Sequence, residues 1–384
     1  MVPKGWIASQ VGDIAMFSSG GTPSKQSAHF WGGTEPWISG KDLKTHYLAT
    51  SIDTLTEDGF KVAKKAPKGS SLILVRGMTL LKDFPVGYAT REVAFNQDLK
   101  ALVPNKDIDG LFLSFLLVAE KNKILQLVST AGHGTGRLDT ESIKSYPVNI
   151  PPLSEQNKIA KILSTWDKAI STTEQLLANS QQQKKALMQQ LLTGKKRLLD
   201  SNGVKFQGEW HRTELGELLD YKQPTPYLVE STEYRDEYKT PVLTAGKTFI
   251  LGYTDETSGI YQEKLPVIIF DDFTTDSKFV DFPFKAKSSA MKILVAKKGV
   301  SIKYVFEAMQ MLNFAVGGHQ RHWISIFSNL VIPVPSKEEQ ERIASVLSAA
   351  DQEIQTLQSQ LDALKQEKKA LMQQLLTGKR RVQP

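Results

Sequence analysis

One long segment of this chain occurs twice in the sequence. Residues 184–197, KKALMQQLLTGKKR, return as residues 368–381, KKALMQQLLTGKRR, and thirteen of the fourteen positions are identical. The same offset of 184 residues matches Glu155-Gln156 with Glu339-Gln340 farther upstream. A repeat of this length indicates a duplicated structural element, so the chain must fold around two copies of it.

Both copies carry apolar residues at alternating spacings of three and four, which predicts a narrow apolar seam along a helix. Thr173, Ser180 and Lys184 interrupt the first seam, and Lys368 interrupts the second. Such a seam needs a partner helix, and the nearest candidate is the other copy; a pair of ordinary core helices is the alternative. The seam residues are Leu163, Trp166, Ile170, Leu177, Leu187 and Leu191 in the first copy, and Leu347, Ile354, Leu357, Leu361, Leu364, Leu371 and Leu375 in the second.

The same signals mark the ends of both helices: a proline, a serine as the N-cap, and a closing glycine followed by basic residues. The regions before the two helices, residues 1–150 and 209–334, are expected to be two globules. The first helix leads away from the first globule, and the second helix starts at the second globule. Twin helices that pack together must therefore run antiparallel, which returns the C-terminus to the first globule. The end signals are Pro152, Ser154 and Gly194 in the first copy and Pro335, Ser336 and Gly378 in the second.

The regions before the two helices share a frame but little else. Gly5-Trp6 recurs as Glu209-Trp210, while the sequences that follow differ and the second is twenty residues shorter. Both alternate β-rich runs with turns and contain one helix, near residues 109–128 and 302–314, which predicts two mixed α/β globules of the α+β class. The expected strands are residues 71–75, 86–89, 101–103, 267–270 and 291–295. This duplicated scaffold is expected to present two different reading surfaces.

The expected organisation alternates globule and helix and gives a pseudo-twofold, nearly circular chain with an antiparallel coiled coil. Its parts are residues 1–150 as the first globular domain, 151–194 as the first helix, 195–208 as a linker, 209–334 as the second globular domain, 335–378 as the second helix and 379–384 as a basic tail.

Composition limits the possible functions. The chain has no cysteine, so a disulfide framework and a thiolate metal site are excluded. It has no apolar run long enough to span a membrane and no signal-peptide core, which predicts a cytoplasmic protein without a membrane partner. The formal charge of +7 and the pI near 9.2 favour a polyanionic partner.

Several fragments resemble catalytic motifs but lack a required part. The segment 245–248, AGKT, has Pro241 where a phosphate-binding loop needs glycine, and the segment 132–136, GHGTG, has Arg137 at its third glycine position. His319 and His322 have no evident third metal ligand, and there is no Asn-Pro-Pro-Tyr methyltransferase signature. The acids Asp271, Asp272 and Asp276, near Lys278, are interpreted as solvated turn residues. The chain is therefore predicted to have no chemistry of its own.

The remaining candidate segments are suited to binding a ligand. Glycine-rich segments at 131–137 and 317–323 end the two globules, and glycine lets a backbone approach phosphate closely. The alternative for both is a tight turn. A third segment, residues 18–25, is small and basic, with an ordinary surface loop as its alternative. The candidate DNA contacts are Thr22, Lys25, Lys41, Arg76, His133, Thr135, Arg137, Lys247, His319, Gln320 and Arg321.

The chain as a whole resembles the specificity subunit of type I restriction–modification enzymes. The resemblance rests on the two-domain, two-helix arrangement, on the helix openings at 151–156 and 335–340, and on Gly20–Pro23 followed by Pro36–Ile38. The second globule departs from the pattern, because it has Gln223–Pro226 in place of the Gly-Gly-Thr-Pro segment.

The resemblance implies a noncatalytic subunit that reads an asymmetric bipartite target in double-stranded DNA. It would hold two methyltransferase subunits and, through them, the restriction and translocase subunits. The cofactors S-adenosylmethionine, ATP and Mg²⁺ would then belong to those partners. Two alternatives stay open: a self-contained DNA-modifying enzyme with fused recognition domains, and a duplicated coiled-coil scaffold that binds no DNA.

Overall fold

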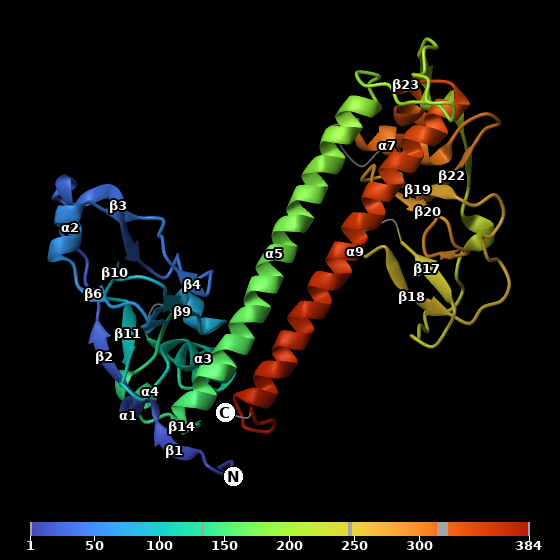
Figure 1. The fold of residues 1–384 in the computed structure, drawn as a ribbon. Helices are drawn as coiled ribbons and strands as arrows, with labels where there is room; N and C mark the ends of the chain where they lie inside the picture. The colour runs from blue at the N-terminus through green and yellow to red at the C-terminus, as the bar shows by residue number, and fades with distance from the viewer. Residues whose placement is uncertain (1, 132–133, 245–247, 313–321, 383–384) are drawn as a thin grey trace. The chain divides into compact units, whose positions relative to one another are not determined.

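The computed structural model describes residues 2–131, 134–244, 248–312 and 322–382 (Figure 1). The chain forms two compact units, Met1–Glu174 with Gln360–Pro384, and Gln175–Ser359. Each unit contains one globule and part of both long helices. Both units combine helices with several small sheets, which confirms the expected α+β class.

The core of the first unit is a five-stranded sheet with one helix packed on it (Figure 1). Helix α3 (Gly110–Leu125) buries Phe112 and Phe115, and each such side chain stabilises the fold by about 1.5–3 kcal/mol. Asp109 caps α3, because its Oδ1 accepts a hydrogen bond from the Phe112 amide at 2.7 Å. The predicted strands and helix of this globule are confirmed with small shifts at their ends. The core strands, in spatial order, are β2 (Ala15–Ser19), β11 (Leu99–Pro104), β7 (Ser71–Leu74), β9 (Val86–Ala89) and β4 (Tyr47–Leu48).

Smaller elements complete the described part of the first unit. The sheets are β5 (Thr54–Leu55), β3 (Trp31–Ile38), β10 (Val93–Phe95) and β6 (Lys65–Ala66); β12 (Ser129–Ala131), β13 (Thr135–Arg137) and β8 (Arg76–Gly77); and β1 (Ile7–Gln10) with β14 (Pro147–Ile150). The short helices are α1 (Val11–Ile14), α2 (Glu57–Val62), α4 (Thr140–Lys144), η1 (Ala28–Phe30) and η2 (Met78–Leu81).

The second unit repeats the central arrangement. Strand β22 lies between β16 and β19, as β11 lies between β2 and β7, and α7 occupies the place of α3. The strands are β16 (Leu219–Lys222), β22 (Met291–Ala296), β19 (Val267–Asp271) and β20 (Ser277–Val280); β18 (Ile250–Thr254), β17 (Thr240–Leu243) and β21 (Lys285–Ala286); and β15 (His211–Glu214) with β23 (Val331–Val334). The helices are α6 (Leu215–Leu218), α7 (Ile302–Gln310), α8 (His322–Ser325), η3 (Thr225–Tyr227) and η4 (Phe327–Asn329).

The two repeated segments form long helices, α5 (Leu153–Leu191) and α9 (Lys337–Leu375), of 39 residues each (Figure 1). Gly194 and Gly378 follow them with φ of 72° and 69°, the left-handed conformation expected of a closing glycine. Ser336 accepts a hydrogen bond from the Glu339 amide, as predicted for an N-cap. The prediction for Ser154 is wrong, since α5 already begins one residue before it. No helix among the described residues is long and apolar enough to cross a membrane.

Polar contacts between the two long helices give their direction within each unit. The residue number falls along one helix as it rises along the other, so α5 and α9 are antiparallel in both units. Asp167 and Asp351 are equivalent in the repeat, as are Lys184 and Lys368. The contacts are Asp167–Lys368 at 2.5 Å and Glu174–Lys365 at 2.8 Å in the first unit, and Lys184–Asp351 at 2.5 Å and Ser180–Glu353 at 3.0 Å in the second.

All of the predicted seam positions are turned away from open solvent. Of the polar residues that interrupt the first seam, Thr173 and Ser180 are buried as well. They therefore occupy the seam without breaking the helix. Among the apolar seam residues, Leu163, Leu177, Leu191, Leu347, Leu361 and Leu375 are buried, and Trp166, Ile170, Leu187, Ile354, Leu357, Leu364 and Leu371 are half-buried.

The duplicated Glu-Gln pair joins each long helix to its globule. Gln156 Oε1 accepts a hydrogen bond from the amide of Asp109, the cap of α3, at 2.9 Å. Gln340 Oε1 accepts one from the amide of Ser301, the cap of α7, also at 2.9 Å. The glutamines thus fix the same junction twice, which explains why the dipeptide recurs.

The glutamate of each pair is buried and binds an arginine from beyond the glycine of the other helix. Glu155, 2% exposed, accepts two hydrogen bonds from Arg381 at 2.7 and 2.8 Å. Glu339, 1% exposed, accepts two from Arg197 at 2.6 and 2.7 Å. Hydrogen bonds from Arg381 hold the pKa of Glu155 below its usual range.

The same arginines anchor the two segments that contain them, which were expected to be a linker and a tail. The segment 195–208, expected to be a plain linker, is anchored by Arg197 and folds back through a Leu199–Lys205 bridge. The expected basic tail is likewise anchored by Arg381, which also donates to the Lys4 carbonyl. The described ends of the chain therefore lie side by side in the first unit (Figure 1).

Lys184, which interrupts the apolar pattern, belongs to a network of four charges around the buried Glu307 in the second unit. Glu307 is fully buried and lies 3.0 Å from the Lys184 ammonium and 2.7 Å from that of Lys303. Asp351 pairs with the same two lysines. Burial alone would raise the pKa of Asp351, but hydrogen bonds from the lysines outweigh it and leave the pKa below 3.8. This stabilisation is therefore present above pH 3.8 and is lost as the pH falls through the lowered value.

In the first unit, the residue equivalent to Lys184 is Lys368. Lys368 pairs with Asp167, which also accepts a hydrogen bond from the Tyr47 hydroxyl at 3.0 Å. Burial, together with Lys368, lowers the pKa of nearby His46 to about 4, although Asp167 acts in the opposite direction. His46 is therefore neutral near pH 7, and its ring stacks on Phe115.

Lys184→Met is expected to destabilise the second unit by about 2 kcal/mol, because it leaves the buried Glu307 and the half-buried Asp351 with one lysine. Equilibrium urea unfolding followed by circular dichroism measures this. Gln181→Met, an exposed position one turn earlier, should change stability by less than about 0.5 kcal/mol. Adding Glu307→Gln to Lys184→Met should recover part of the loss; equal stability of Lys184→Met and the natural chain would contradict the network.

Candidate nucleic-acid interface

Two predicted DNA contacts, Arg76 and Arg137, lie opposite each other on neighbouring strands. Strands β8 and β13 pair antiparallel, with Arg76 facing Arg137 and Gly77 facing Gly136. Directly opposite residues project from the same face of a sheet, so both guanidinium groups emerge together. The glycine at 136 is required, because a Cβ there would lie 2.8 Å from the Leu80 Cβ. Gly136 therefore allows the close packing of β13 that sets Arg137 opposite Arg76.

The arginine pair lines a cleft of about 360 Å³ in the first unit. The carboxylate of Asp139 in this cleft is already engaged, since it caps α4 by accepting hydrogen bonds from two backbone amides. Among the described residues, neither arginine forms an ion pair with a carboxylate, and both are exposed. Two such guanidinium groups can bind phosphate or a guanine edge. The cleft is lined by Val75, Arg76, Gln97, Asp98, Lys100, Arg137, Leu138, Asp139 and Thr140.

The segment with the Gly-Gly-Thr-Pro motif lies beside this cleft. Thr22 donates a hydrogen bond to Gln97 Oε1 at 2.5 Å, and the Gly21 amide donates to the Phe95 carbonyl at 2.8 Å. At Gly20 a Cβ would lie 2.1 Å from the Asn96 carbonyl oxygen, so only glycine allows this close approach. The segment is therefore docked on the globule, and an ordinary surface loop is the wrong description for its glycine end.

The other described candidates lie outside the cleft lining. Lys25 is exposed, Lys41 is exposed and lies 4.0 Å from Asp53, and Thr135 is half-buried in β13 opposite Ala131. The remaining candidates, His133, Lys247, His319, Gln320 and Arg321, lie outside the described residues.

The second unit has the equivalent strands, but the lysine at the equivalent position has different surroundings. Lys100 in β11 donates to Ser19 at 2.6 Å, and Lys292, at the same place in β22, donates to Gln223 at 3.0 Å. Lys292 is 1% exposed, however, and also lies 3.5 Å from Asp272. A lysine that is turned inward cannot contact a ligand at the surface, so the two units differ at this position.

The acids near this lysine correct one expectation from the sequence. Asp271 and Asp272 were expected to be solvated turn residues, but both are buried. Asp271 accepts hydrogen bonds from the Phe273 and Thr274 amides, and Asp272 accepts one from the Trp323 amide at 2.9 Å. The acids therefore hold the turn after β19, and the described residues contain no cluster suited to a metal ion.

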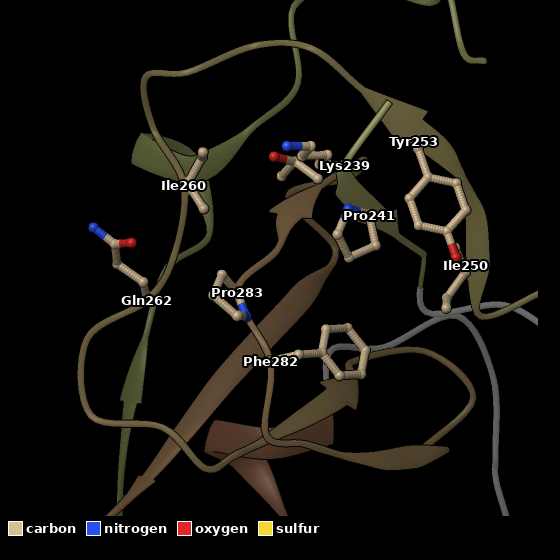
Figure 2. A pocket seen from close by; sticks show the side chains of 9 residues that line it. Lys239, Pro241, Ile250, Tyr253, Ile260, Gln262, Phe282 and Pro283 are labelled. Atoms are coloured by element: carbon tan, nitrogen blue, oxygen red, sulfur yellow. The ribbon is translucent and has the colours of Figure 1, made fainter. Parts of the chain in front are cut away.

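The second unit also has a recess of about 420 Å³ beside the sheet β18-β17-β21 (Figure 2). In Figure 2, Pro241, Pro283 and the ring of Phe282 face the same space. Lys239 is the one cation among the lining residues, so the recess lacks the paired arginines of the cleft. It is lined by Lys239, Thr240, Pro241, Ile250, Tyr253, Ile260, Gln262, Phe282 and Pro283.

Comparison with protein families settles what the repeated architecture is. The type I restriction modification DNA specificity domain matches the chain twice, over residues 3–179 and 207–366. The chain belongs to this family. Each match covers one globule and much of the long helix that follows it, so the family domain is the duplicated unit.

Relatives in this family match the chain in part or throughout. A type I restriction enzyme specificity subunit of Escherichia coli is 53% identical over 145 residues, which are 36% of this chain and 35% of that protein. One of Methanocaldococcus jannaschii is 30% identical over 180 residues, 44% of this chain and 39% of that protein. A putative one from the same organism is 24% identical over 426 residues, 99% of this chain and 95% of that protein. The chain thus matches little more than a third of the first two relatives.

Solved structures share the fold. The S subunit of a type I restriction-modification system from M. genitalium has a TM-score of 0.72 at 16% identity, covering 98% of this chain and 99% of that one. A chain from a study of complex assembly and conformational transition of the type I R-M system has a TM-score of 0.53 at 15% identity, covering 98% of both. At these identities the likeness concerns the fold alone.

Only Arg76 and Arg137 of the residues that line this cleft were predicted from the sequence, and the polar residues that sequence reasoning missed include Gln97 and Lys100. Gln97 and Lys100 come from the turn before β11 and from β11 itself, where single polar residues in a strand region give no signal of their own. Aligning the two halves would have paired Lys100 with Lys292, since both are the second residue of equivalent strands.

Proposed function

We propose that this chain is the DNA-recognition subunit of a type I restriction–modification complex and reads an asymmetric bipartite target. The duplicated specificity domain, with two unlike surfaces on one framework, supports a target of two different halves. The cleft with Arg76 and Arg137 is the observation that carries the proposal for the first half, because its guanidinium groups are exposed and free of carboxylate partners in the described structure.

The subunit would act by binding and positioning alone. We propose that it holds two methyltransferase subunits and, through them, restriction and translocase subunits, in the cytoplasm. S-adenosylmethionine, ATP and Mg²⁺ would be bound by those partners. Arg76 and Arg137 would fix the register of the DNA through phosphate contacts or read a base edge in the major groove.

The purified chain alone is expected to show neither methylation nor cleavage of DNA, because its sequence carries no intact nucleotide, metal or cofactor motif. Incorporation of a labelled methyl group, and gel assays of cleavage, measure this. Assembly with its methyltransferase subunits should restore methylation at one bipartite sequence. Activity of the chain alone would favour a self-contained enzyme, and an assembled complex that ignores DNA sequence would favour a plain scaffold.

A further inference from the structure

The position of Arg76 in the first unit has a counterpart in the second unit that the backbone identifies. Val75 directly follows β7, and Asp272 directly follows β19. Both residues form two backbone hydrogen bonds to equivalent neighbours, and the strand registers agree, so Phe273 occupies the place of Arg76. The hydrogen bonds run from Val75 N to Asp98 O and from Leu138 N to Val75 O, both at 2.9 Å, and from Asp272 N to Ala290 O at 3.2 Å and from His322 N to Asp272 O at 3.0 Å.

Phe273 lies on a turn whose backbone is held from inside the globule. The buried carboxylate of Asp271 accepts hydrogen bonds from the amides of Phe273 at 2.9 Å and Thr274 at 3.3 Å. The Asp271 amide donates to the Asp276 carbonyl at 2.8 Å, which closes the turn. Thr275 has a φ of 62°, a left-handed conformation that a β-branched residue adopts only where its surroundings impose it. The turn therefore presents Phe273 in one fixed place.

The Phe273 side chain does not serve the packing of the second unit. It is 39% exposed and belongs to neither hydrophobic core that the described residues of this unit form. Single exposed apolar side chains are common on protein surfaces, so exposure alone indicates no function. Phe273 differs from such residues because its backbone is fixed and because the equivalent residue, Arg76, lines the cleft of the first unit.

A phenyl ring and a guanidinium group at this place would recognise different features of a base pair. Arg76 can donate hydrogen bonds to guanine, whereas a phenyl ring has no hydrogen-bonding atom and discriminates by apolar contact. Thymine alone presents a methyl group in the major groove. The protein already covers more than half of the surface of Phe273, which suits contact with one methyl group and not insertion of the ring between base pairs.

We propose that Phe273 contacts the methyl group of a thymine in the second half of the DNA target, and so determines part of its sequence. This inference rests on the proposed function, from which it takes double-stranded DNA as the ligand. The neighbouring Lys292 agrees with an uncharged contact, because its ammonium group is turned inward and lies 3.5 Å from the Asp272 carboxylate. One position of a shared framework thus favours guanine or phosphate in the first unit and thymine in the second.

The test measures binding of the assembled complex to duplexes that carry its mapped target, by fluorescence anisotropy at fixed salt. Each thymine of the second half-site, on either strand, is replaced in turn by deoxyuridine, which lacks only the methyl group. One replacement should weaken binding by the natural complex about fourfold, which corresponds to about 0.8 kcal/mol for one buried methyl group.

Phe273→Ala should weaken binding to the unmodified duplex about fivefold and should make the complex insensitive to that replacement. The matched control is Leu251→Ala, which removes a side chain of 40% exposure from the same unit. It should bind as the natural chain does and keep the fourfold effect. Phe273→Arg installs the residue of the first unit and should shift the preference at the same base pair towards guanine.

Each other outcome refutes a specific statement. No effect of any deoxyuridine in the natural complex, or the same fourfold effect after Phe273→Ala, overturns the thymine contact. Loss of the effect in Leu251→Ala assigns it to exposed apolar surface in general. If circular dichroism shows that Phe273→Ala or Phe273→Arg unfolds, Phe273→Leu replaces it and should reduce the effect below twofold; an unchanged effect overturns the contact. An assembled complex without any sequence preference refutes the proposed function, whereas sequence-specific binding without methyl dependence refutes only the role of Phe273.

Discussion

The double substitution Arg76→Ala and Arg137→Ala is expected to lower the affinity of the assembled complex for its target about 100-fold. A single arginine contact to a base edge contributes about 1–3 kcal/mol, and a factor of 100 corresponds to about 2.7 kcal/mol. The two residues face each other across one strand pair, so their effects should not add fully. Fluorescence anisotropy at fixed salt with a labelled target duplex measures the change.

The matched control removes the same two charges from the same unit. Lys68→Ala with Lys106→Ala changes exposed lysines that are neither in the cleft lining nor among the candidate DNA contacts, and is expected to cost less than about tenfold. An equal loss in the control would show that net charge, and not the cleft, binds DNA. Loss of the circular dichroism signal in the arginine variant would instead favour the glycine-rich segment as a structural turn.

Arg137→Lys separates the two ways in which this arginine can act. Lysine keeps the positive charge but cannot form the paired hydrogen bonds of a guanidinium group with guanine. Near-natural affinity with an unchanged preference for bases would assign Arg137 to phosphate. Reduced affinity with a relaxed preference at one base pair would assign it to a base edge.

The sequence predicted the parts of the fold that periodicity and end signals determine. The apolar seams, Gly194 and Gly378, and the main strands all follow from local spacing, so they could be placed without coordinates. The contribution of Lys184 to stability could not be predicted, because it depends on Glu307 and Lys303, which come close to Lys184 only in the folded unit. Lys184 does interrupt the apolar pattern, and in the folded unit it is paired with Glu307 and Asp351.

The candidate site shows the same limit. Arg76 and Arg137 were named as separate candidates, and no local signal shows that they are cross-strand neighbours. The burial of Asp271 and Asp272 was missed for a related reason, since acids next to Thr-Thr-Asp resemble an exposed turn until the Trp323 amide is placed against them. Sequence reasoning thus identifies residues with suitable side chains, whereas the tertiary structure determines which of them pair.

Lengthening both long helices by the same amount is expected to change the spacing between the two half-sites and to leave their bases unchanged. If paired helices separate the recognition domains, the span of 29 residues from Leu163 to Leu191, about 43 Å, corresponds to about 10 to 13 base pairs between half-site centres. That is close to one DNA turn, which would place both half-sites on one face of the duplex.

Insertion of four helical residues after Glu174 and after Gln358, equivalent positions of α5 and α9, adds about 6 Å and should lengthen the preferred spacer by one or two base pairs. Seven residues keep the phase of the apolar seam, add about 10 Å and should lengthen it by about three base pairs. Insertion into one helix alone displaces antiparallel partners such as Lys184 and Asp351 and should abolish assembly. Methylation-site mapping of the assembled variants reads spacer and bases together: an unaltered spacer would refute the ruler, and altered half-site bases would show that the helices shape the reading surfaces themselves.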